Sequence, residues 1–234
     1  MSKESNLNAR TGAPRAATLS ALVTALGLIG GLLLGGAAGE LVFNFLPGHS
    51  TTQPSVAHIL LAAAPALLGI LAGSAVWGAW MGRLAGARDG RRMAAAGALG
   101  FAPITIALGL ALALLEPVAV DRLGAQFPIA GLFTLFFVPA AGLIAGVGAG
   151  AIGLGLRDKA LAWRLGWRAG LAAGITFLLV NVALEQLGWR VGAPQAAARA
   201  TMLTVLLLSN LGAALVAGAA VGGQLSRWAA LRQI

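Results

Sequence analysis

The chain has 234 residues, of which 59% are hydrophobic and only 10% are charged, and its mean hydropathy is +0.87. Because soluble domains carry about 25% charged residues, this composition excludes a water-soluble globular protein and indicates that lipid forms part of its solvent. There is no cysteine, which excludes disulfides, thiolate metal sites and cysteine nucleophiles. The net charge of +9 alone would suit nucleic-acid binding.

Six apolar runs follow one another along the chain. Residues 1–16 are a polar tail, and the first run covers residues 17–39. At about 23 residues it exceeds the roughly 7–15 residues of a signal-peptide core, so we expect a membrane anchor. The further expected spans are residues 56–81, 93–115, 128–156, 169–187 and 200–225. At 1.5 Å per residue, each can cross a hydrocarbon core of about 30 Å.

Two prolines within these spans are candidates for helix kinks. Pro103 lies within the third span and Pro139 within the fourth. Because proline removes a backbone hydrogen bond, we expect both helices to be kinked, which a helix bundle can accommodate.

The basic residues predict how the chain crosses the membrane. Thirteen of the 16 lie in the N-terminal tail, in the loops at 83–92 and 157–168, and in the C-terminal tail. Because cytoplasmic loops are enriched in Lys and Arg, both termini are expected in the cytoplasm, and we expect a prokaryotic inner membrane. This bias accounts for most of the positive charge, so no nucleic-acid partner is expected.

The spans pair into three similar helical hairpins, residues 15–83, 92–157 and 168–227. The second helix of each hairpin is glycine-rich and ends at an arginine, as in Gly142, Gly146, Gly150 and Arg157 of the middle unit. The predicted fold is therefore an all-α integral membrane protein. A cytoplasmic tail (1–16) precedes a six-helix bundle (17–226), and a second tail (227–234) follows it, with the internal repeat as a further prediction.

Small residues recur every four positions on most spans, a pattern that lets helix backbones approach closely. The glycines expected to pack helices together are Gly27, Gly31, Gly35, Gly69, Gly73, Gly142, Gly146, Gly150, Gly170, Gly174, Gly218 and Gly222.

Three glutamates, Glu40, Glu116 and Glu185, are expected to end the outward-running helices, where a carboxylate opposes the helix dipole. They are either hydrated or paired at the membrane surface, or they ring an outer vestibule that attracts cations or solutes. Asn181 lies one turn before Glu185 and either hydrogen-bonds another helix or contacts a transported solute.

No catalytic, cofactor-binding or metal-binding motif stands out. His49 and His58 have no neighbouring acids at ligand spacing, and the glycine runs lie within spans and not after a strand. We therefore expect a non-catalytic protein without cofactor or metal. The first interpretation is a helix-packing subunit that associates with other membrane subunits or with itself. The alternative is a small-solute or cation transporter, or the substrate-capture subunit of one.

Overall fold

A computed structural model describes residues 14–27, 56–123, 129–187 and 196–232. For residues 56–63, 66, 109–123, 129–133 and 196–203 it describes the backbone only. Within these ranges the chain is all-helical. The first helical segment occupies residues 14–27. The other five helices are α2 (Val56–Leu84), α3 (Gly90–Leu123), α4 (Ile129–Gly155), α5 (Lys159–Gln186) and α6 (Ala196–Arg232).

Helix α5 begins about ten residues earlier than the sequence pattern indicates, so the loop expected at 157–168 is mostly helix. The cause is Asp158, whose extended backbone and side-chain carboxylate cap the helix by accepting a hydrogen bond from the Leu161 N–H at 2.9 Å. Asp89 caps α3 in the same way through the Arg92 N–H at 3.0 Å. The basic residues after each cap extend the helices beyond their apolar part.

Two other helix ends also differ from expectation. Helix α3 continues to Leu123, so Glu116 lies inside a helix and not at its C-terminal end. The expected opposition between this carboxylate and the helix dipole is therefore wrong for Glu116, because the dipole's effect is confined to the last turn. Helix α6 continues to Arg232, so most of the expected C-terminal tail is helical.

The connections after α2 and α4 share one geometry. Gly86 (φ 69°) and Arg157 (φ 60°) adopt the left-handed conformation that ends many helices. The following N–H groups close each turn, with Ala87 donating to the Gly82 carbonyl at 2.8 Å and Asp158 to the Gly153 carbonyl at 3.1 Å. Each connection thus turns the chain back so that the next helix packs antiparallel.

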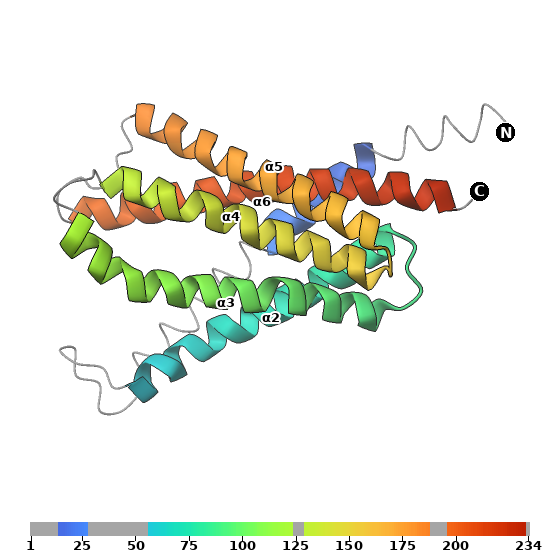
Figure 1. Ribbon diagram of the computed structural model, residues 1–234, viewed down its shortest axis with the longest axis horizontal. Helices are drawn as coiled ribbons and strands as arrows, with labels where there is room; N and C mark the ends of the chain where they lie inside the picture. Colours follow the sequence, from blue (N-terminus) through green and yellow to red (C-terminus); the bar gives the residue numbers. More distant parts are fainter. Residues whose placement is uncertain (1–13, 28–55, 124–128, 188–195, 233–234) are drawn as a thin grey trace.

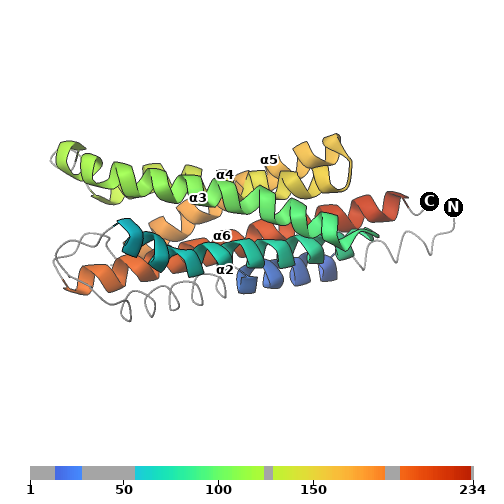
Figure 2. The ribbon, with the colours of Figure 1, turned by 90° about the horizontal axis from the view of Figure 1, so that it is seen from below.

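The helices run side by side along the long axis of the molecule (Figures 1 and 2). Each packs mainly against its neighbours in the sequence, so that together they form a ring. The N-terminal segment closes the ring between α6 and α2. Its buried Ser20 hydroxyl donates to the Gly218 carbonyl at 2.6 Å and contacts the Met81 sulfur at 3.3 Å. In addition, the Trp77 indole N–H donates to the Thr24 hydroxyl at 2.8 Å.

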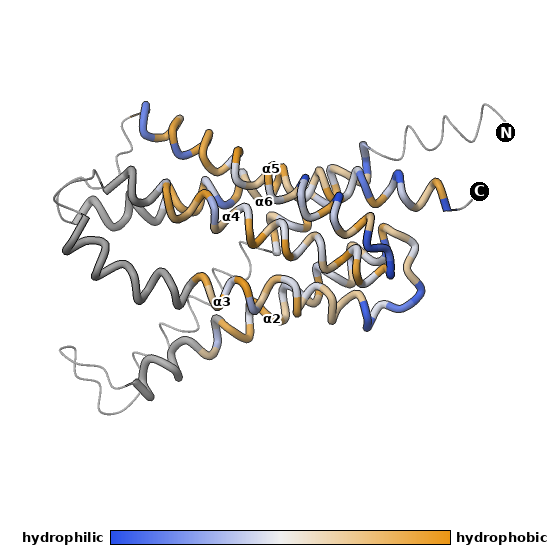
Figure 3. Tube along the Cα trace, in the orientation of Figure 1, coloured by the Kyte–Doolittle hydropathy of each residue, from blue (hydrophilic) through white to orange (hydrophobic). Residues whose placement is uncertain are grey.

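Polar residues gather at one end of the ring (Figure 3), which contains the α2–α3 and α4–α5 connections and the end of α6. We call this the basic end. Contacts across it agree with the picture, because Arg92 donates to the Leu154 carbonyl at 3.4 Å and Arg232 pairs with Asp158 at 3.2 Å.

Within the described part of the chain, four helices are long and apolar enough to cross a membrane, which indicates an integral membrane protein. Their apolar stretches are Leu67–Leu84, Thr134–Gly155, Lys159–Gln186 and Thr204–Arg232. The N-terminal segment is described over residues 14–27 only, too short to span. In α3 the described side chains stop at residue 108 and include Arg91 and Arg92. Six spans therefore stay a prediction.

Glycine allows the tightest helix contacts. A Cβ on Gly97 of α3 would lie 2.7 Å from the Gly78 Cα of α2 and would overlap the Ser74 carbonyl oxygen. Between α4 and α5, a Cβ on Gly142 or Gly146 would lie 3.1 Å from the carbonyl oxygen of Gly170 or Gly166, respectively. The backbones of these neighbouring helices are therefore in direct contact, as is typical of small-residue membrane interfaces.

Candidate functional site: a central cavity

The ring surrounds a half-open cavity of about 280 Å³ to which all six helical segments contribute. Most of its wall consists of glycine, alanine and other apolar side chains. Trp77 and Phe101 form part of this wall and pack edge to face, with ring centroids 4.8 Å apart. The space stays open because the side chains on the inward faces of the helices are short and do not fill the centre of the ring.

A few polar groups also face this cavity. The Thr24 and Ser74 hydroxyls donate to carbonyls of their own helices, those of Ser20 and Ile70. The Asn210 Nδ2 donates to the Leu206 carbonyl at 2.8 Å, but its Oδ1 accepts no hydrogen bond from the described residues. Thr105 likewise has no hydrogen-bond partner among them. Two lining groups thus retain hydrogen-bonding capacity for a bound molecule.

No Asp, Glu, Lys, Arg or His is among the described residues that line the cavity. The described part of the chain also has no group of three His, Cys, Asp or Glu side chains that could hold a metal ion. The site therefore offers hydrogen bonds and apolar contact, without a charged ligand for an ion.

Of the three predicted acids, the structure describes the side chain of Glu185 alone, and it does not line the cavity. Glu40 lies outside the described residues, as does the side chain of Glu116. Glu185 is exposed in the last turn of α5. Asn181, one turn earlier, is buried at 6% exposure, and its Nδ2 has no hydrogen-bond partner among the described residues. The exposed acid and the buried amide thus have different surroundings, and neither lines the cavity.

The glycines of the sequence analysis have three different environments. Gly27, Gly69, Gly73 and Gly218 line the cavity. Gly142, Gly146, Gly150, Gly170 and Gly174 lie in the α4–α5 contact, and Gly222 lies against Ser20. Gly31 and Gly35 lie outside the described residues. The sequence analysis missed Gly78 and Gly97, although Ser74, Gly78 and Gly82 form a row of small residues at four-residue spacing.

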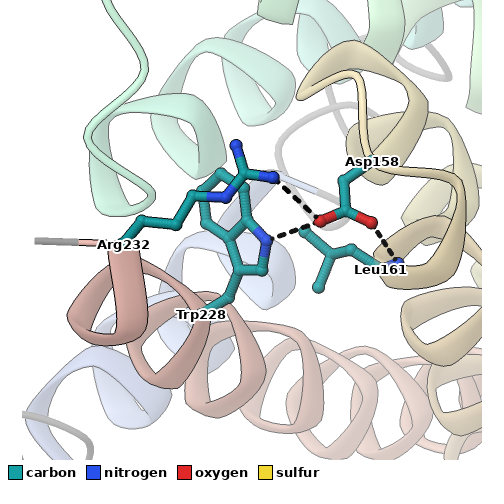
Figure 4. Close-up of polar contacts among 4 residues, drawn as sticks. All are labelled: Asp158, Leu161, Trp228 and Arg232. Carbon is teal, nitrogen blue, oxygen red and sulfur yellow. Dashed lines mark hydrogen bonds and ion pairs between the residues drawn. The ribbon is translucent and has the colours of Figure 1, made fainter. Parts of the chain in front are cut away.

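A polar cluster connects two helices at the basic end (Figure 4). The Asp158 carboxylate caps α5 and accepts hydrogen bonds from α6, from the Trp228 indole N–H at 2.9 Å and from Arg232 at 3.2 Å. The Arg232 guanidinium also stacks 4.4 Å from the Trp228 ring centroid. The Leu161 N–H, followed by the Trp228 indole and the Arg232 charge, lowers the pKa of Asp158 below its ordinary value. This cluster ties the α4–α5 connection to α6.

We expect Asp158→Ala to destabilise the protein by about 2–3 kcal/mol, because it removes a helix cap and leaves the Trp228 N–H without its acceptor. Asp89→Ala is the matched control, since Asp89 caps α3 but bonds no other helix among the described residues, and it should cost about 1 kcal/mol. Equilibrium unfolding in detergent measures both losses. If the two variants lose the same unfolding free energy, the cluster does not stabilise the contact between the α4–α5 connection and α6.

The same pair gives a pH test. Because the pKa of Asp158 is lowered on folding, its ionised form contributes stability fully above about pH 4, the ordinary aspartate value. That contribution is lost as the pH falls through the lower folded-state pKa. The difference in unfolding free energy between wild type and Asp158→Ala should therefore narrow below about pH 4. A difference independent of pH would show that the carboxylate charge is not involved.

No protein family model, curated protein or solved structure matches this chain.

Proposed function

We propose that this is a non-catalytic integral membrane protein that binds a small, uncharged and mainly apolar molecule in the central cavity, for transport or capture. The observation that carries the proposal is a cavity of about 280 Å³ lined by every helical segment of the ring. It lies near the lower limit of ligand pockets, which span about 300–1,000 Å³. A dry apolar cavity of about 150 Å³ already binds benzene, so a single-ring molecule fits this size.

The lining favours an uncharged ligand. Moving an ion into an apolar site is costly unless a partner charge is present, and the described lining has none. Thr105 and the Asn210 Oδ1 can orient one or two polar groups of an otherwise apolar molecule. Of the transport functions considered from the sequence, small-solute binding therefore has more support than cation transport.

The helix-packing subunit has less support than the sequence pattern indicates. That interpretation needs small-residue helix faces that are available for contact with another chain. In the structure, the glycines at 142, 146 and 150 are used against α5, and Gly78 and Gly97 against each other. Association with other membrane subunits, or with itself, stays a prediction.

For the membrane arrangement we propose six spans, with the basic end in the cytoplasm of a prokaryotic inner membrane. The support is the meeting of the α2–α3 and α4–α5 connections, the end of α6 and the start of the N-terminal segment at one end of the ring. Loops rich in Lys and Arg stay on the cytoplasmic side.

Filling the cavity should abolish binding. Ala213 is 5% exposed and lines the cavity from α6, so Ala213→Leu places three further carbon atoms inside it. We would record thermal unfolding in detergent with a panel of small uncharged single-ring alcohols and amides. A ligand at about 100 times its Kd stabilises the wild type by about 2.7 kcal/mol, and this stabilisation should disappear in Ala213→Leu.

Val216→Leu is the matched control, because Val216 lies on the same helix, is 45% exposed and does not line the cavity. It should respond to the panel like the wild type. Asn210→Leu should weaken those ligands that carry a hydrogen-bond donor more than those that carry none. Equal stabilisation of wild type and Ala213→Leu by every compound would show that the cavity is not the binding site.

A further inference from the structure

A second hollow, a surface groove of about 1240 Å³, runs along α4 between α3 and α5 on the outside of the ring. It shares no lining residue with the central cavity. Its floor is made of small residues such as Gly146, Gly150 and Ala151, and its rim is made of exposed apolar side chains such as Leu99 and Leu143. From Gly155 to Pro139 it follows α4 for about 24 Å at 1.5 Å per residue.

The groove has a charged end. Arg92 of α3 and Lys159 of α5 line it where α4 ends, at the basic end of the ring. Among the described residues neither side chain forms an ion pair, and Arg92 contacts only the Leu154 carbonyl, at 3.4 Å. Trp163 and Trp167 stand beside them at 76% and 59% exposure. One groove thus combines two cations that have no carboxylate partner among the described residues, two exposed indoles and a long apolar track.

We propose that this groove binds one anionic phospholipid, with its phosphate between Arg92 and Lys159 and an acyl chain along α4. Basic pockets between membrane helices recognise anionic headgroups, and tryptophan favours the headgroup level of the bilayer. The track exceeds the depth of one leaflet, about half of a 30 Å core, so it covers a full acyl chain.

A lipid suits this groove better than a partner helix. Helices associate in membranes where small residues let backbones touch, but Gly142 and Gly146 already pack against Gly170 and Gly166 of α5, where an added Cβ would lie 3.0–3.1 Å from a carbonyl oxygen. What remains exposed is a narrow track between larger side chains, of which Leu99 is 72% and Leu154 is 56% exposed. A flexible acyl chain can follow such a track and leave its phosphate at the two cations.

The test is native mass spectrometry of the delipidated full chain titrated with dioleoylphosphatidylglycerol or dioleoylphosphatidylcholine. The wild type should retain one phosphatidylglycerol and bind it at least tenfold more tightly than phosphatidylcholine. The variant Arg92→Gln with Lys159→Gln should lose this preference. The control, Arg91→Gln with Arg164→Gln, removes the same charge from exposed positions of α3 and α5 outside the groove and should change affinity less than twofold.

A second variant tests the apolar part. Val147 is 44% exposed and lines the groove, so Val147→Trp should obstruct the acyl chain and weaken both lipids, whereas Val216→Trp on α6 should not. Equal affinity of the wild type for the two lipids would overturn the proposal. Equal losses of phosphatidylglycerol affinity in the groove and control double variants would also overturn it, because they would indicate an effect of diffuse surface charge. A second protein chain that displaces the bound lipid would overturn it as well.

Discussion

Replacing Gly97 with alanine is expected to destabilise the protein by about 3 kcal/mol, the upper end of the usual cost of overpacking. The added methyl group would lie 2.7 Å from the Gly78 Cα and 2.9 Å from its nitrogen, and would overlap the Ser74 carbonyl. All three are backbone atoms, so no side-chain rotation relieves the overlap and α3 must move away from α2. Equilibrium unfolding in detergent measures this loss.

Gly90→Ala is the matched control on the same helix. A Cβ at Gly90 would meet no atom within 4 Å, and alanine is the better helix former by about 1 kcal/mol. Gly90→Ala should therefore leave stability unchanged or raise it. If both variants lose the same amount, glycine is needed in α3 for a reason other than the contact with α2.

Replacing Gly222 with leucine is expected to detach the N-terminal segment from α6. A Cβ at this position would lie 2.7 Å from the Ala16 carbonyl oxygen and 3.0 Å from the Ser20 hydroxyl, and would overlap the Ser20 Cβ. Because the natural chain has no cysteine, disulfide trapping can report the docking directly. A Cβ on Gly223 would lie 3.9 Å from the Ala17 Cβ, close to the mean of about 3.8 Å found in disulfides.

Oxidation of the pair Ala17→Cys and Gly223→Cys should therefore cross-link nearly every molecule. Adding Gly222→Leu should reduce the yield at least fivefold. The control pair Ala17→Cys and Val216→Cys should not cross-link, because position 216 lies about 10 Å further along α6. Two results would contradict closure of the ring by the N-terminal segment. One is efficient cross-linking of the cysteine pair when Gly222→Leu is present, and the other is no cross-linking of the pair when Gly222 is retained.

The helical membrane class could be predicted from the sequence, because apolar runs separated by short polar loops leave few alternatives. The helix ends could not be predicted from the sequence. Hydropathy marks where an apolar stretch stops, but a helix can continue beyond that point. Helix α5 starts at Lys159, directly after the Asp158 cap and ten residues before the apolar part predicted from Ala169. Asp158 and Asp89 are the residue type that caps helix N-termini, but each lies in a loop whose arginines mark it as a polar connection.

The candidate site was less predictable. Glycines at four-residue spacing show that one face of the helix carries small residues, but they do not show what that face packs against. Gly146 packs against the α5 backbone, where an added Cβ would lie 3.1 Å from the Gly166 carbonyl oxygen, whereas Gly69 and Gly73 line a cavity. Asn210 was visible as a polar residue within a span, yet its place in the cavity depends on helices that are distant in the sequence.

The most direct measurement of the central claim is native mass spectrometry of the wild-type chain, taken from its own membrane in mild detergent. The proposed function predicts one small, uncharged molecule bound per chain, absent from Ala213→Leu and present in Val216→Leu. A stoichiometric protein partner with no such mass would contradict it, and would favour the helix-packing subunit instead.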